Sequence, residues 1–185
     1  MDKIKNSIVI LVDTKEQRNE HIISFFDKKK IQYKRVNLNY GDYSCMIPKG
    51  TIGQFTSDVY FDREFVIERK ADIDELAGNL KDDAARLRKE LAHLNMYQIR
   101  FLIYIEDLNF EINLRNGNFR SQHDPKTLMN RLYKTIECEY NTTIVPVDKS
   151  VMGSKIYNRM QSCVHTLFKH KGFILEESES DINEN

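Results

Sequence analysis

Short apolar runs rich in β-branched residues alternate with helical patterns along most of this chain of 185 residues. Residues 8–12 (Ile-Val-Ile-Leu-Val) and 101–105 (Phe-Leu-Ile-Tyr-Ile) are continuous apolar runs, and an acidic residue follows each of them. Runs of this length and composition predict strands that are buried on both faces of a sheet. Four more extended segments are expected at residues 32–38, 44–47, 60–70 and 143–147.

Helical spacing of apolar residues predicts the elements between these strands. Residues 72–96 carry leucines at helical spacing and are expected to form a helix that breaks near Gly78 or at residues 81–83. Asp124 and Pro125 are suited to begin a further helix, because aspartate accepts bonds from helical N–H groups and proline fits the first turn. Two other helices are expected, one from Ile22 to residues 28–30 and one over residues 150–170, closed by Gly172.

The alternation of strands with helices, and a hairpin-like pair of strands around Asp42, predict an α/β fold. We expect a three-layer sandwich in which a mixed central β-sheet is flanked by helices. Residues 1–175 are expected to form a single domain, because this length suffices for one core. The polar segment 109–123 is expected to be a loop that shapes a cleft, and the acidic tail 176–185 is expected to be disordered.

The composition excludes several classes of protein. The apolar content of 41% is ordinary for a globular domain, and no stretch reaches the roughly 18 apolar residues of a membrane span. The first residues lack the apolar segment of a signal peptide, so we expect a cytoplasmic location and no membrane partner. Three cysteines without CxxC spacing argue against a disulfide framework or structural zinc. The histidines lack HExxH spacing, which disfavours other kinds of metal chemistry.

The charge of the chain is balanced overall and uneven along its length. The 28 basic and 28 acidic residues give a net charge that does not point to a nucleic-acid partner. The acidic tail leaves the rest of the chain net basic. Basic clusters occur at residues 28–35 and 86–89. Each is interpreted first as a solvated face and second as a contact for phosphate groups.

The sequence Glu68-Arg69-Lys70, which ends an apolar run, is the most informative for chemistry. Because side chains alternate along a strand, Glu68 and Lys70 point to the same side and Arg69 points to the other. Asp13 ends the first expected strand, and Asp42 lies at the expected hairpin. Carboxylates hold hard cations such as Mg²⁺, and a neighbouring ammonium stabilises developing negative charge.

Hydrolysis of a phosphodiester needs an activated water, neutralised phosphate charge and a stabilised leaving oxygen. Asp42 and Glu68 are expected to bind Mg²⁺ directly, and Asp13 is expected to hold a second ion or a water of the metal. Lys70 is expected to orient the water or to stabilise charge. Asp74 is expected to fix Lys70 or another basic residue through a salt bridge.

Each of these residues also has a structural interpretation. Alone, an aspartate can end a strand or occupy a turn, and Glu68-Arg69-Lys70 can be a strand that emerges into water. Their joint occurrence in this order favours the catalytic interpretation. Arg69 is expected in a structural salt bridge or at the substrate, and Glu16 is a candidate cap for the first helix.

The series resembles the nuclease domain of the XPF family of structure-specific endonucleases, a branch of the restriction-endonuclease-like superfamily. The family signature is GD followed, after a spacer, by ERKxxxD, and it is present as Gly41-Asp42 and residues 68–74. The earlier acidic box, D-x-R-E, is present as Asp13-Thr14-Lys15-Glu16. Lysine in place of arginine keeps the charge of this box but loses bidentate phosphate recognition. Further similarity lies at residues 85–91 and 105–106, within a total span of residues 8–170.

The resemblance implies cleavage of DNA near branch points, flaps or forks, with dependence on Mg²⁺ or Mn²⁺. DNA contacts are expected at Lys15, Arg69 and Arg86, and His123 is placed to approach phosphates. Family nuclease domains often dimerise, so a homodimer or a partner protein is expected to contribute to the grip on DNA. A bacterial or phage setting is expected. The alternative is a non-catalytic subunit that binds DNA or scaffolds a nuclease; the intact acidic residues and lysine argue against it.

Overall fold

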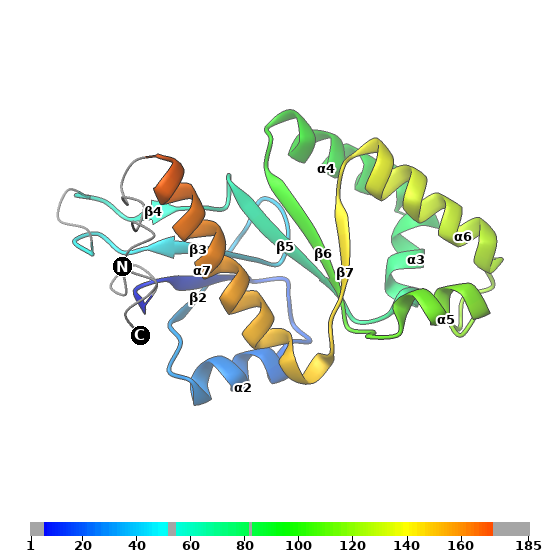
Figure 1. The fold of residues 1–185 in the computed structure, drawn as a ribbon, viewed down its shortest axis with the longest axis horizontal. Helices are drawn as coiled ribbons and strands as arrows, with labels where there is room; N and C mark the ends of the chain where they lie inside the picture. Colours follow the sequence, from blue (N-terminus) through cyan, green and yellow to red (C-terminus); the bar gives the residue numbers. More distant parts are fainter. Residues whose placement is uncertain (1–5, 52–54, 82, 172–185) are drawn as a thin grey trace, which may run out of the picture.

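The computed structural model describes residues 6–51, 55–81 and 83–171, which form one mixed β-sheet between two layers of helices (Figure 1). The α/β sandwich expected from the sequence is confirmed. The strands are β1 Val9–Asp13, β2 Tyr33–Val36, β3 Tyr43–Ile47, β4 Val59–Tyr60, β5 Phe65–Lys70, β6 Arg100–Ile105 and β7 Thr143–Pro146. The helices are α2 Glu20–Lys28, α3 Ile73–Lys81, α4 Ala84–Met96, α5 Phe110–Asn116, α6 Pro125–Arg131, the π-helix Leu132–Glu139, the 3₁₀ turn Lys149–Val151 and α7 Met152–His170.

Strand β3 runs antiparallel to both of its neighbours in the strand order β2-β1-β3-β5-β6-β7. The other pairs along this order are parallel, and the short β4 pairs with β3. The N–H of Asp13 donates to the carbonyl of Asp42, and the N–H of Asp42 donates to the carbonyl of Ile67, each at 2.8 Å. The end of β1 and the middle of β5 are therefore joined through the residue that precedes β3.

Alternate residues of the central strands face two different hydrophobic cores. Leu102 and Tyr104 of β6 pack with α2 and α7, whereas Ile103 and Ile105 pack with α3 to α6. Figure 1 shows α2 beside α7, and it shows α3, α5 and α6 gathered at the other end of the molecule. Within the described ranges, no helix has the length and apolar character needed to cross a membrane.

The single long strand expected at 60–70 is wrong, because the chain forms two strands there. β4 ends at Tyr60 and β5 begins at Phe65. The N–H groups of Glu64 and Phe65 both donate to the carbonyl of Phe61, and these bonds close a turn. The buried ring of Phe61 anchors this turn in the core. Both β4 and β5 run antiparallel to β3, so the turn interrupts the strand without reversing the chain.

The expected loop at 109–123 is also corrected, because it contains helix α5. This helix buries Phe110 and Leu114, which lie about one turn apart, and it ends at Gly117 in the left-handed conformation with φ of 71°. The helix was not expected from the sequence, because only two buried residues form its apolar side and the surrounding residues are polar. The segment is therefore anchored to the core near its start.

Other helix boundaries follow the expected capping chemistry. The side chain of Asp124 accepts a bond of 2.8 Å from the N–H of Thr127, and Pro125 is the first residue of α6. The helix expected across 72–96 breaks between α3 and α4, so Gly78 lies inside α3. Gly172 and the tail 176–185 lie outside the described residues.

We expect the contact between α2 and α7 to depend on Gly153. A β-carbon added there would lie 2.8 to 3.0 Å from atoms of Phe25. Gly153→Ala should therefore lower the free energy of unfolding by about 1–3 kcal/mol through overpacking, as measured by urea unfolding. Gly78→Ala is the matched control, because nothing lies within 4 Å of its added β-carbon. The control should raise the free energy of unfolding by about 0.5–1 kcal/mol. If both variants change the free energy of unfolding equally and in the same direction, this account is contradicted.

Candidate active site

Four of the five expected catalytic residues line one pocket on the side of the sheet that α3 and α4 cover. Asp13 ends β1, Asp42 directly precedes β3, and Glu68 and Lys70 lie at the end of β5. The register of β3 against β5 places Asp42 opposite Glu68. The pocket has a volume of about 430 Å³ and is open to solvent. Residues from three separate strands thus meet at one point.

Asp42 is oriented by the backbone of the neighbouring strand. Its Oδ2 atom accepts a hydrogen bond of 2.7 Å from the N–H of Arg69. Burial raises the pKa of Asp42 well above its usual range, and the nearby charge of Glu68 raises it further. A bound cation would stabilise the charged form of Asp42 beside Glu68.

Lys70 is the buried positive charge of the pocket, with 8% of its surface exposed. Its ammonium donates to Glu68 Oε1 at 2.6 Å and to Glu75 Oε1 at 3.4 Å. Burial lowers the pKa of Lys70, but the nearby carboxylates outweigh this effect and the pKa is raised. Lys70 therefore remains charged. The contact with Glu75 was missed from the sequence; its only signal is an acid in the first turn of the helix that follows β5.

Asp13 lines the pocket but also has a structural contact. It is buried, and its Oδ1 atom accepts a hydrogen bond of 3.2 Å from the N–H of Leu38. This bond fixes the segment between β2 and β3 against the end of β1. The contact of Asp13 with a second ion or its water stays a prediction.

Asp74 forms its salt bridge with Arg120, whereas Lys70 pairs with the two glutamates. The carboxylate of Asp74 accepts bonds of 3.1 Å from both the N–H and the Nε of Arg120, and one of 2.6 Å from the N–H of Ser121. Burial raises the pKa of Asp74, but these bonds outweigh it and lower the pKa. Asp74 thus ties the segment after α5 to the start of α3.

Arg69 points to the opposite face of the sheet, as strand alternation requires, and is 5% exposed. Its guanidinium donates to both oxygens of Glu106, at 2.9 and 2.8 Å, and to Glu16 at 3.1 Å. His21 of α2 contacts Glu106 at 2.5 Å. Glu16 belongs to this cluster, and the N-cap position of α2 is Asn19, so the capping role considered for Glu16 is wrong. These contacts favour the structural interpretation of Arg69 over a contact with DNA.

Basic side chains from two other segments also line the pocket. Lys15 follows β1, and Arg86 and Lys89 come from α4. The same helix contributes Glu90, whose pKa is raised by burial and by the charge of Glu68. Glu90 was not expected from the sequence. Its signal is the spacing of four residues from Arg86, which places both on one face of α4.

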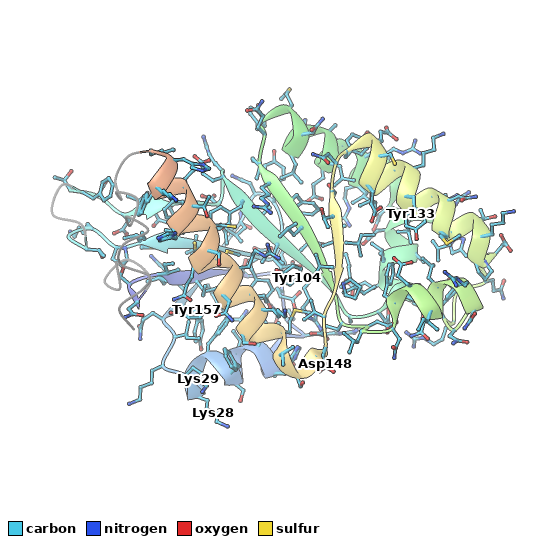
Figure 2. All side chains as sticks on the ribbon, viewed as in Figure 1. Lys28, Lys29, Tyr104, Tyr133, Asp148 and Tyr157 are labelled. Carbon is cyan, nitrogen blue, oxygen red and sulfur yellow. The ribbon has the colours of Figure 1, made fainter. Side chains whose placement is uncertain are left out.

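The basic cluster at residues 28–35 lies outside this pocket. Figure 2 shows Lys28 and Lys29 extending from the end of α2 at the outer edge of the molecule. Both side chains are exposed. Their position favours the interpretation of this cluster as a solvated face.

The donor set of the pocket fits a hard divalent cation. Asp42 and Glu68 supply carboxylate oxygens, and Mg²⁺ commonly takes one or two carboxylates and completes its shell with water and phosphate oxygens. In the part of the chain that the structure describes, no group of three His, Cys, Asp or Glu side chains is arranged to hold a metal by itself. Such an incomplete protein shell leaves positions open for water and for a phosphate group.

Comparisons with known proteins give the family. A family model, the ERCC4 domain, matches residues 12–160. The solved structure of XPF from Aeropyrum pernix has a TM-score of 0.59 at 16% identity, and the match covers 89% of this chain and 69% of that one. XPF from the same organism in complex with DNA has a TM-score of 0.56 at 16% identity, with 85% and 66% covered. A search of curated proteins finds no match.

The family match spans most of the chain, so the chain belongs to the ERCC4 domain family. The resemblance to the XPF nuclease domain, first drawn from the GD and ERKxxxD motifs, is confirmed. The matched range runs from β1 into α7, and it therefore includes every residue of the pocket.

We expect Arg69→Met to lower the free energy of unfolding by about 2–4 kcal/mol, because it leaves Glu106 and Glu16 without their buried partner. Burial raises the pKa of Glu106, but Arg69 and His21 outweigh this and hold the pKa below its usual range. A lowered carboxyl pKa stabilises the fold above the ordinary value of about 4.3, and this stability is lost as the pH falls through the lowered pKa. The difference between variant and wild type should therefore shrink below about pH 4.

Arg86→Met is the matched control, because the side chain of Arg86 is 72% exposed and pairs only at the surface with Asp83. It should lose at most about 1 kcal/mol. Urea unfolding at neutral and acidic pH measures both variants. If Arg69→Met is as stable as the control and binds DNA more weakly than wild type, Arg69 contacts DNA and its structural assignment is wrong.

Proposed function

We propose that this chain is a metal-dependent endonuclease that hydrolyses phosphodiester bonds in DNA. The observation that carries the proposal is that Asp42, Glu68 and Lys70 line one pocket. The basic side chains of Lys15, Arg86 and Lys89 form a wall of the same pocket. Membership of the ERCC4 domain family supports the same reaction. The likeness of the fold to an XPF structure solved in complex with DNA is consistent with it.

The chain's own groups meet three needs of the reaction. Asp42, held by the N–H of Arg69, and Glu68 present carboxylate oxygens at one point of the pocket. The ammonium of Lys70 lies beside Glu68, where it can orient a water molecule or stabilise negative charge on the phosphate. The basic side chains of the wall are placed to neutralise neighbouring phosphates and so to position the strand.

Asp42 and Glu68 would hold the metal, with Mg²⁺ or Mn²⁺ as the expected ion and Asp13 as a candidate for a second position. When bound, such an ion supplies charge stabilisation at phosphate oxygens and lowers the pKa of a water molecule. Asp74, through Arg120, is assigned a positioning role at the start of α3.

The proposed substrate is DNA with a branch, flap or fork. The neutral net charge of the chain favours a homodimer or a partner protein that adds to the grip on DNA, because 28 basic residues are offset by 28 acidic ones. The competing proposal is a non-catalytic subunit that binds DNA or scaffolds a nuclease. The presence of Asp42, Glu68 and Lys70 together favours the enzyme.

Glu68→Gln and Lys70→Met should each lower kcat/KM for DNA cleavage by at least about 10²-fold. The first change removes a charged metal ligand, and the second removes the ammonium that stabilises charge. Cleavage of labelled linear, flap, fork and four-way DNA is measured with Mg²⁺, Mn²⁺ or EDTA. Circular dichroism shows whether each variant is folded.

Asp27→Asn is the matched control, because Asp27 is an exposed carboxylate on α2 outside the pocket. It should cleave like the wild type. Full activity in folded Glu68→Gln would refute the assigned site. Salt-sensitive DNA binding by the wild type, without cleavage of any of these substrates, would favour the non-catalytic subunit.

A further inference from the structure

A second pocket adjoins the active-site pocket along α4. Asn39 and Tyr40, in the segment between β2 and β3, line both pockets and form their shared wall. The second pocket has a volume of about 380 Å³. The first pocket lies at the end of β5, and the second lies beside the residues that precede β5 and β6. We call the two adjoining pockets the groove. The remaining residues of the second pocket are Asp62, Arg63, Tyr97 and Ile99.

One face of α4 forms a side of this groove. Arg86, Glu90 and His93 line the first pocket, and Tyr97, directly after the helix, lines the second. Their spacings of four, three and four residues place these side chains on one helix face. At about 1.5 Å of rise per residue, the face from Arg86 to Tyr97 is about 16 Å long, which matches roughly four or five nucleotides of a stacked strand.

The second pocket and its surroundings present aromatic rings. Tyr97 is 62% exposed, and nearby Tyr60 is 47% exposed. Tyr60 lies opposite Met46 in the antiparallel pair of β4 and β3, so it faces the same side of the sheet as the active site. Tyr40 packs against the core under α3 and α4, and its hydroxyl lies 3.5 Å from His93 Nδ1. Tyr40 is thus a fixed ring and Tyr97 an accessible one.

We propose that this groove binds an unpaired DNA strand, whose bases stack on Tyr97 and Tyr40 while its phosphates meet the basic side chains. The inference rests on the proposed function, and it assigns the contact with the unpaired nucleotides of the proposed branched DNA to Tyr97 and Tyr40. Base faces are hidden inside a duplex, so exposed rings recognise unpaired bases. Stacking on tyrosine is tolerant of sequence, as a structure-specific enzyme requires.

Continuity and charge favour a nucleic-acid strand over a protein as the occupant. One of the two adjoining pockets is lined by Glu68 and Lys70, so a strand cut there can extend along α4 into the other pocket. Arg63 lies in the far pocket and Arg86 in the near one, which gives a cation at each end of the groove for the phosphates. Asp62 lines the far pocket with Arg63, and Glu90 lines the near pocket with Arg86. These acids limit the positive charge of the groove, so stacking is expected to carry much of the contact.

The test compares Tyr97→Ala, Tyr97→Phe and wild type in EDTA, where cleavage is blocked. Fluorescence anisotropy gives Kd for a single-stranded oligothymidine, a linear duplex and a flap. Tyr97→Ala should raise Kd for the single strand and the flap by at least about fivefold, the effect of losing one stacked base, and should leave Kd for the duplex unchanged. Tyr97→Phe keeps a stacking face and should bind like the wild type.

Tyr133→Ala is the matched control, because this tyrosine lies on the π-helix away from the groove (Figure 2). It should bind every DNA like the wild type. The inference would be overturned if Tyr97→Ala binds DNA with wild-type affinity, or if it loses equal affinity for the single strand and the duplex. It would also be overturned if Tyr97→Phe loses as much affinity as Tyr97→Ala. A changed oligomeric state in Tyr97→Ala with unchanged DNA affinity would also overturn it and assign the surface to a protein contact.

Failure of this inference is distinguishable from failure of the proposed function. With Mg²⁺ present, the ratio of flap cleavage to duplex cleavage is compared between the wild type and Tyr97→Ala. If both proteins cleave DNA with the same ratio, the stacking surface is refuted and the nuclease assignment stands. Absence of cleavage by the wild type refutes the nuclease, whereas the binding measurements in EDTA still decide whether the groove holds a single strand.

Discussion

Two backbone hydrogen bonds at Asp42 hold the candidate site together. Its carbonyl accepts the N–H of Asp13, and its own N–H donates to the carbonyl of Ile67. These bonds join the end of β1 to the middle of β5 through the residue that precedes the antiparallel strand β3, so acids that lie far apart in the sequence line one pocket. The carboxylate of Asp42 also accepts the N–H of Arg69, and the acid is therefore oriented by the strand that carries Glu68.

The two faces of β5 differ in their electrostatics. On one face, Arg69 and Glu106 neutralise each other in a buried pair, and the loss of Arg69 would leave the carboxylates of Glu106 and Glu16 without its guanidinium. On the other face, the charge of Glu68 opposes the ionisation of Asp42, and the ammonium of Lys70 offsets part of that negative charge. Such an arrangement is unfavourable for folding and suited to a divalent cation, which is a common property of functional sites.

Local patterns could be predicted from the sequence, and contacts between distant elements could not. The alternation along Glu68-Arg69-Lys70 follows from strand geometry, so the separation of Arg69 from the pocket was predictable. The partner of Lys70 was not, because Glu75 reaches it only where α3 packs beside the strand end. The pairing of Asp74 with Arg120 likewise depends on α5. The sequence did not reveal this helix, because its apolar side is short and the surrounding residues are polar. The division of 60–70 into two strands depends on the buried ring of Phe61.

The claim that Asp42 and Glu68 form a single cation site is tested most directly by anomalous diffraction from crystals soaked in Mn²⁺. The account predicts an anomalous peak within bonding distance of a carboxylate oxygen of both residues, and it predicts loss of this peak in Glu68→Gln crystals. A peak held by other residues, or a peak that persists unchanged in the variant, would contradict the account.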